Sequence, residues 1–246
     1  MTAAQCRDQA RCPVGDPGAL RSVRTLSIDA GEIWHNVGSV EHDDIFNSSG
    51  KGNGRFSPLR SGGNGEPLPH LYLARNPIGA LLETVLHGFT AANREVVAGR
   101  DLVGRTLRSV ELPERLLVAD LRDQELERLG IDRRSLVSSS SEHYRCTQEW
   151  AYRIRSLKPG GRSLAGIVWN SRVAEIVSTV AAPTTRALLV PPLTEVCVVY
   201  GDRTTAPPTR WGSEVTRSDL MVGPGLELVL DLVVQQLDGF VTGAIG

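Results

Sequence analysis

The stretch Leu71-Tyr-Leu-Ala-Arg-Asn-Pro-Ile-Gly-Ala-Leu-Leu-Glu83 decides the fold. It opens with a short apolar strand over 71–74, after which Asn76 supplies a helix N-cap and Pro77 a first helical residue. Apolar side chains then recur at the spacing of a helix that buries one face, from about 77 to 89. They are Ile78, Leu81, Leu82, Val85, Leu86 and Phe89. The sequence therefore predicts a strand followed at once by a buried helix.

Similar patterns extend outward in both directions. Residues 25–34 are typical of a strand, a turn and the start of a second strand, and glycine-rich loops follow at 47–54 and 62–65. Further strands are expected at 102–110, 116–120, 164–170 and 195–200, and further helices at 123–129, from Ser140 or Ser141 to about 157, and from Pro224 onward. Because the strands cluster with few intervening helices, we expect an α+β fold. We expect a loose leader over 1–23, one core domain over 24–200, and a C-terminal loop and helix over 201–246 that pack on the domain.

Composition narrows the class of protein. The chain has 246 residues, of which 41% are hydrophobic and 22% charged, and this suits a single domain with a sizeable core. A formal net charge of −1 argues against direct nucleic-acid binding, and no apolar run reaches the roughly 18 residues that a membrane span needs. The four cysteines form no CxxC pair and no His or Cys pair has ligand spacing, so we expect no metal. Reduced thiols and the lack of an apolar signal segment favour the cytoplasm.

Glu83 is the most informative polar residue of the expected helix. On a helical wheel it lies off the apolar stripe, beside Gly79 and Ala80 one turn earlier and His87 one turn later. The two small residues leave space above the carboxylate, where a ligand could approach. A solvated glutamate on an exposed helix face is the alternative, and the helix alone does not decide between them.

Three other places could carry chemistry. Arg55 closes a glycine-rich loop, where backbone N–H groups and a guanidinium could hold a phosphate, although ordinary surface loops share this composition. Tyr72 lies in an otherwise aliphatic strand, either as a core tyrosine or as a site residue. Ser171 and Arg172 follow a buried strand directly, at the rim of a sheet or at a plain strand end. The chain has neither a Walker loop nor a GxSxG elbow, so these motifs do not indicate a P-loop protein or a serine hydrolase.

Taken in order, these motifs form a set. The chain resembles the RES domain family, named for its Arg, Glu and Ser, in Gly54-Arg-Phe56, Leu71-Tyr-Leu-Ala74, Ala80-Leu-Leu-Glu83 and Gly166-Ile-Val-Trp-Asn-Ser-Arg172. The segment from Asp29 to His35 resembles the first strand of the family, and Glu149-Trp-Ala151 resembles the helix before its Ser strand. The resemblance covers roughly residues 25 to 200.

The resemblance implies an enzyme that degrades NAD+, by hydrolysis or phosphorolysis, as the toxin of a toxin–antitoxin pair with a helix-turn-helix (Xre-type) antitoxin. It also implies a fold similar to that of the ADP-ribosylating toxins, with flanking helices and NAD+ held in the cleft of a split mixed β-sheet. Carried over by position, Arg55 would bind the pyrophosphate, Tyr72 would line the nicotinamide end, and Glu83 would be the catalytic carboxylate. Ser171 would hold the nicotinamide–ribose portion.

One position departs from the family pattern. His35 stands where many members carry an Arg, and it would bind phosphate less strongly because an imidazole is only partly charged at neutral pH. Another arginine could substitute for it; the candidates are Arg60, Arg75 and Arg172. Two alternatives stay open: transfer of ADP-ribose to a macromolecule, and a catalytically silent domain that binds NAD+ or a partner protein. Whether the chain forms a homo-oligomer stays open as well.

Overall fold

The computed structural model describes residues 20, 22–41, 44–62, 65–87, 93–139, 141–171, 194–212 and 215–243. Phe89, Ser140, Arg172 and nearly all of the expected leader lie outside these residues. The strands are β1 (Thr25–Ile28), β2 (Ile33–Ser39), β3 (His70–Ala74), β4 (Glu95–Val97), β5 (Arg105–Glu111), β6 (Leu116–Asp120), β7 (Gly166–Asn170), β8 (Glu195–Tyr200), β9 (Val215–Asp219) and β10 (Phe240–Thr242). The α-helices are α1 (Pro77–Thr84), α2 (Asp123–Arg128), α3 (Arg133–Leu136), α4 (Tyr144–Ser156), α6 (Pro208–Gly212) and α7 (Gly223–Leu230).

Short 3-10 and π segments connect several of these elements. The 3-10 turns are η3 (Ser141–His143), η4 (Pro159–Gly161) and η5 (Gly201–Arg203), and the π segments are η2 (Ala98–Leu102) and η6 (Asp231–Gln236). The π segment η2 ends at Leu102, the first residue of the strand expected at 102–110, and the strand itself begins only at Arg105.

A mixed sheet forms the centre of the molecule. Within the described residues it has eight strands in the order β1-β6-β7-β8-β3-β2-β5-β9, and β4 and β10 pair separately. The β6–β7 pair is parallel and the other neighbours in the large sheet are antiparallel. The predicted α+β fold with a mixed sheet is confirmed.

The sheet is split between β2 and β3. Strand β2 pairs with β5 along its whole length, from Ile33 opposite Glu111 to Ser39 opposite Arg105. Its pairing with β3 is a single position, His35 opposite Ala74. From this point the two strands diverge, so the sheet opens toward the end of β2. The split sheet predicted from the family resemblance is therefore present, and it leaves room for a cleft.

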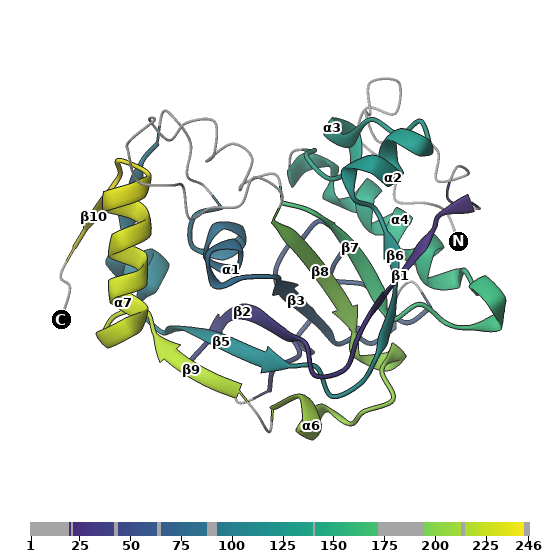
Figure 1. Ribbon diagram of the computed structural model, residues 1–246, viewed down its shortest axis with the longest axis horizontal. Coiled ribbons are helices and arrows are strands. Elements are labelled where there is room, and N and C mark those ends of the chain that lie inside the picture. The colour runs from purple at the N-terminus through teal and green to yellow at the C-terminus, as the bar shows by residue number, and fades with distance from the viewer. Residues whose placement is uncertain are drawn as a thin grey trace.

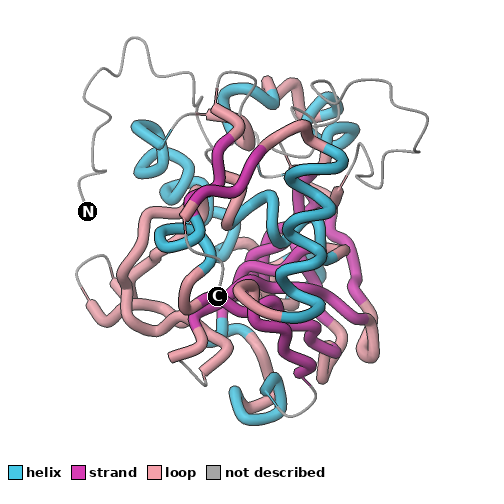
Figure 2. Tube along the Cα trace, turned by 90° about the vertical axis from the view of Figure 1, so that its left-hand side faces the viewer, coloured by secondary structure: helices cyan, strands magenta, loops and turns pink. Residues whose placement is uncertain are grey.

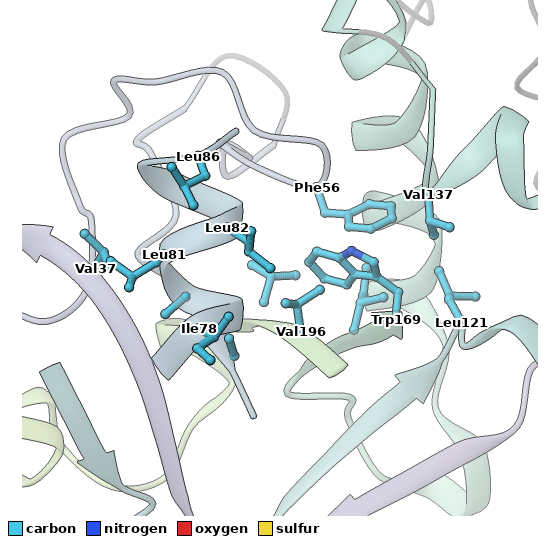
Figure 3. Close-up of a cluster of buried hydrophobic side chains, with 14 of the residues drawn as sticks. Val37, Phe56, Ile78, Leu81, Leu82, Leu86, Leu121, Val137, Trp169 and Val196 are labelled. Atoms are coloured by element: carbon cyan, nitrogen blue, oxygen red, sulfur yellow. The ribbon is translucent and has the colours of Figure 1, made fainter. Parts of the chain in front are cut away.

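Two hydrophobic clusters cover the two faces of the sheet. Figure 1 shows α1, α7 and the group α2–α4 on one side of the strands and α6 on the other, and Figure 2 shows the same layering from a second direction. The larger cluster joins α1 to the sheet, and Figure 3 shows Leu81 and Leu82 of α1 directed at Val37 and Val196 of the strands. The smaller cluster contains the fully buried Trp34 of β2.

Helix α1 begins as predicted but ends earlier. The Asn76 side chain accepts a hydrogen bond from the Gly79 N–H at 2.7 Å, which confirms the N-cap. The helix ends at Thr84, whereas the apolar spacing predicted an end near residue 89. The N–H of Leu86 bonds to the carbonyl of Leu81, five residues back, so this turn buries Leu86 without continuing the α-helical ladder.

The residues beyond 201 contribute to both the sheet and the core. Strand β9 pairs with β5 and forms the edge of the sheet. Helix α7 follows it, and the helical path continues through the π segment η6. Val229, Leu232, Val233 and Leu237 from this region are buried in the larger cluster. The apolar spacing that predicted a last helix from Pro224 onward thus corresponds to a buried face.

Candidate active site

A cavity of about 1100 Å³ occupies the split between β2 and β3. Its walls are the diverging ends of β2 and β3, the loop between these strands, and the C-terminal end of α1. Cavities for small ligands usually measure roughly 300–1,000 Å³, so this one is large enough for an extended molecule such as a dinucleotide. Cationic groups and carboxylates both line it, and the former are Lys51, Arg55, Arg105 and Arg108.

Glu83 and Ser171 meet at one wall of this cavity. Glu83 lies on the last turn of α1 and lines the cavity, and it accepts a hydrogen bond from the Ser171 hydroxyl at Oε1. Ser171 follows β7 directly, is fully buried, and is held by the bond from its backbone N–H to the Thr194 carbonyl at 2.8 Å. The serine therefore fixes one orientation of the carboxylate and itself lies behind it.

The small residues on α1 have a different role from the one the helical wheel suggested. Gly79 and Ala80 are buried, and a Cβ added at Gly79 would lie 2.3 Å from Cγ2 of Thr194. The space that a larger side chain would fill is thus taken by Thr194. The expectation that Gly79 leaves room for a ligand above Glu83 is wrong: this glycine lets α1 pack closely against the chain beside β8, next to Ser171.

Arg55 belongs to the loop between β2 and β3 and also lines the cavity. It is only 8% exposed, and its Nη1 donates to the carbonyl of Leu136 at 3.0 Å and to both the carbonyl and the hydroxyl of Ser139, at 3.0 and 2.7 Å. The guanidinium also lies over the ring of Tyr144, 5.0 Å from its centroid. These contacts hold the cation in one place beside the cavity.

The glycine loop before Arg55 is stabilised by its own hydrogen bonds. The Gly54 N–H bonds to the Ser57 carbonyl at 2.8 Å, and the Gln148 amide donates to the carbonyls of Gly54 and Ser57, each at 2.9 Å. The Gly54 N–H is therefore already used within the turn. Of these two groups, the side chain of Arg55, and not the Gly54 N–H, is the one suited to an anion.

Tyr72 lies in β3 and its hydroxyl meets the same loop. The oxygen accepts hydrogen bonds from the Phe56 N–H at 3.2 Å and from the Ser57 hydroxyl at 3.1 Å. Burial raises the pKa of Tyr72 to about 12, against an ordinary value of 10, so the phenol stays protonated at neutral pH. Gly54 is required beside it, because a Cβ there would lie 2.7 Å from the hydroxyl oxygen.

An aromatic wall adjoins Tyr72. Trp169 of β7 also lines the cavity, and its ring lies edge-on to that of Tyr72, with 6.1 Å between centroids, and to that of Phe56, at 5.0 Å. The pair of Phe56 and Trp169 is visible in Figure 3. The sequence placed Trp169 in a buried strand without assigning it to a site, because nothing local shows that this end of β7 faces the split.

The structure does not bring His35 to the cavity wall. His35 lies on β2, with its Nδ1 3.1 Å from the hydroxyl of Ser109 on β5, and burial lowers its pKa below the ordinary value. Arg60 and Arg75 are likewise not among the residues that line the cavity. Arg60 donates to the Gly65 carbonyl, and Arg75 pairs with Glu32. Arg172 lies outside the described residues.

Several residues that sequence reasoning did not single out line the cavity. Arg105 and Arg108 reach it from β5, Asn36 from β2, and His70 from β3. Asn36 bridges the split, since its amide donates to the Tyr72 carbonyl at 2.9 Å where the strands no longer pair. Burial lowers the pKa of His70, so this imidazole is neutral at neutral pH. The alternation of β5 predicted a strand, but which of its residues face the cavity depends on the place where the sheet opens.

In the described ranges no three His, Cys, Asp or Glu side chains gather so that they could hold a metal ion. Among the helices of these ranges, none is both long enough and apolar enough to cross a membrane.

Fold and site together define a class: a single-domain α+β protein whose split sheet holds a cavity with a fixed carboxylate on one wall and buried guanidinium groups on others. The family model of the RES domain matches residues 32–200. The chain therefore belongs to the RES domain family, as its motifs suggested.

A solved structure shows the same fold. The crystal structure of the M. tuberculosis MbcT–MbcA toxin–antitoxin complex is similar to this chain with a TM-score of 0.51 and 15% sequence identity. The similarity covers 83% of this chain and 91% of that one. The search of curated proteins found no match.

Proposed function

We propose that this chain cleaves the bond between nicotinamide and ribose in NAD+, as a glycohydrolase or a phosphorylase, and that it is the toxin of a toxin–antitoxin pair. The observation that carries the proposal is the Glu83 carboxylate, held by Ser171 at the wall of a cavity of dinucleotide size. Membership of the RES family and a fold shared with one toxin–antitoxin complex support it.

The chemistry needs few groups. When the bond from ribose C1′ to the nicotinamide nitrogen breaks, its electron pair goes to the pyridinium ring, which leaves as neutral nicotinamide without needing a proton. Positive charge develops on the ribose, and a fixed carboxylate stabilises it. Water that adds to C1′ loses one proton and gives ADP-ribose, whereas inorganic phosphate gives ADP-ribose phosphorylated at C1′.

The predicted residues, together with Trp169, then have roles consistent with their contacts. Glu83 faces the developing charge, and Ser171 orients it from behind. Tyr72 and Trp169 form the wall against which the flat nicotinamide ring would lie. Arg55 would bind the pyrophosphate, and its bonds to Leu136 and Ser139 hold it ready, which reduces the entropic cost of binding.

The partner would be a helix-turn-helix antitoxin that covers the mouth of the cavity in the cytoplasm. Co-expression with the product of a small adjacent gene of this type would give a stable complex in which NAD+ cleavage is suppressed. Dissociation of the complex would restore cleavage. A purified toxin whose activity is unchanged by the bound partner would contradict a partner that blocks the site.

The direct test is to incubate the purified protein with NAD+, with and without inorganic phosphate, and to follow nicotinamide release by chromatography. Release that needs no phosphate and yields ADP-ribose identifies a glycohydrolase, and release that depends on phosphate identifies a phosphorylase. Labelled ADP-ribose attached to protein or nucleic acid would instead favour a transferase. Binding of NAD+ without turnover would favour a silent domain, and in that case the proposed cleavage is wrong.

A further inference from the structure

A second buried cation reaches the cavity from the other side of the split. Arg108 of β5 is only 2% exposed and lines the cavity. Arg55, by contrast, is tied to Leu136 and Ser139 next to α3, on the side of the sheet that carries β3, β8 and β7. Two guanidinium groups thus face one cavity from the two halves of the split sheet.

The position of Arg108 depends on a glycine and on one carbonyl group. A Cβ added at Gly38 would lie 2.9 Å from Cζ of Arg108 and 3.0 Å from its Nη1, so the guanidinium lies flat against the glycine. Its Nη2 donates to the carbonyl of Ser39 at 2.5 Å. The glycine and the carbonyl together direct the cation to the end of β2, where the sheet has opened.

Other cationic residues lie near Arg108. On β9, Arg217 lies directly opposite Arg108 in the strand pairing. Arg105, at the start of β5, lines the cavity as well. Glu41 and Asp44 line the cavity too, so charges of both signs are present there. The buried guanidinium of Arg108 is the group placed to select an anion.

We infer that Arg108 is an anion-binding residue that holds the pyrophosphate of the dinucleotide together with Arg55. This inference rests on the proposed function for the identity of the ligand. It gives the chain a cation at the split, where the side chain of His35 lies 3.1 Å from the Ser109 hydroxyl and does not line the cavity. A planar guanidinium can form two parallel hydrogen bonds to phosphate oxygens, which an imidazole cannot.

The test compares three variants in steady-state kinetics with NAD+. Arg108→Gln removes the charge, and Arg108→Lys keeps the charge without the planar guanidinium that can form two parallel hydrogen bonds. Arg217→Gln removes a neighbouring charge that does not line the cavity. We expect Arg108→Gln to raise KM on the order of ten- to hundredfold with kcat within about threefold, and to weaken the rise of KM with added NaCl. Arg108→Lys should lie in between, and Arg217→Gln should change KM by less than about twofold.

An unchanged KM in Arg108→Gln, or a fall in kcat at constant KM, would overturn the inference. Thermal unfolding of each variant separates loss of folding from loss of binding, and if Arg108→Gln does not fold, the KM of Arg108→Lys decides. If the wild-type protein does not cleave NAD+ at all, the proposed function fails, and the inference is then judged by calorimetric titration with ADP-ribose. Binding by the wild type that weakens at least tenfold in Arg108→Gln would still support it, whereas equal binding, or none by the wild type, would contradict it.

Discussion

The hydroxyl of Ser171 donates a hydrogen bond to Oε1 of Glu83, and these residues are 88 positions apart in the sequence. The contact joins the last turn of α1, which packs on the large sheet, to the end of β7, which is one of its strands. Because Glu83 lines the cavity while Ser171 is fully buried, the pair consists of one group that can touch a ligand and one that positions it.

Substitution of Ser171 by Ala should lower kcat. A hydrogen bond to a charged group is worth about 1.5–3 kcal/mol, so we expect kcat to fall roughly ten- to hundredfold with a smaller change in KM. Ser27→Ala, at an exposed position on β1, is the matched control and should be as active as the wild type. Equal kcat values for the Ser171 variant and this control would show that Glu83 needs no support from the serine.

Tyr72→Phe tests the hydroxyl that ties β3 to the loop of Arg55. The substitution leaves the Phe56 N–H and the Ser57 hydroxyl without their acceptor, at a cost of about 1–3 kcal/mol in the free energy of unfolding at pH 8. Urea denaturation measures this loss.

The same variant should also alter the dependence of stability on pH. The pKa of Tyr72 is raised to about 12 in the folded protein from 10, so the unfolded chain loses this proton first as the pH rises. The contribution of this proton to the free energy of unfolding is complete below pH 10. It is lost between pH 10 and 12, by about 1 kcal/mol per pH unit. The difference in stability between wild type and Tyr72→Phe should therefore narrow at pH 11; a constant difference would argue against a raised pKa.

Gly54→Ala should be destabilising because of a steric conflict. The added Cβ would lie 2.7 Å from the Tyr72 hydroxyl and 3.2 Å from the Ser57 carbonyl oxygen. We expect a loss of about 1–3 kcal/mol in unfolding free energy and weaker NAD+ binding, because the loop that carries Arg55 must shift. Gly99→Ala, where an added Cβ meets nothing within 4 Å, should leave both quantities nearly unchanged. Similar effects at the two glycines would contradict the steric explanation.

His35→Ala should change KM for NAD+ by less than about threefold, because the His35 side chain is directed to Ser109 and does not line the cavity. Steady-state kinetics beside the Arg108 variants would show which of the two positions supplies the anion contact. A tenfold rise in KM for His35→Ala would mean that the imidazole reaches the substrate after all.

The local parts of the fold could be predicted from the sequence. A cap such as Asn76 and an apolar spacing of 3.6 residues act within a few turns. The start of α1 and the buried faces of α1 and α4 could therefore be predicted. The end of α1 was predicted too late, since the apolar Leu86 is buried by a single turn outside the α-helix. Strand β9 was missed because it is an edge strand with mostly polar residues.

The site depends on long-range geometry, which local patterns do not contain. The sequence proposed Arg55, Tyr72 and Glu83 through the order of the family motifs, and the structure brings these three to one cavity. Arg108 was not proposed, because its importance arises from the opening of the sheet beyond His35 and from the space left by Gly38. Neither feature is visible in the residues around Arg108 itself.

The central claim is that the Glu83 carboxylate drives loss of nicotinamide from NAD+. The most direct measurement is the rate of nicotinamide release by the wild type, by Glu83→Gln and by the control Glu127→Gln, which changes an exposed residue of α2. We predict that Glu83→Gln, folded and binding ADP-ribose as the wild type does, releases nicotinamide at least about a hundredfold more slowly, while Glu127→Gln matches the wild type. Equal release by Glu83→Gln and the wild type, or no release by any of the three proteins, would contradict the claim.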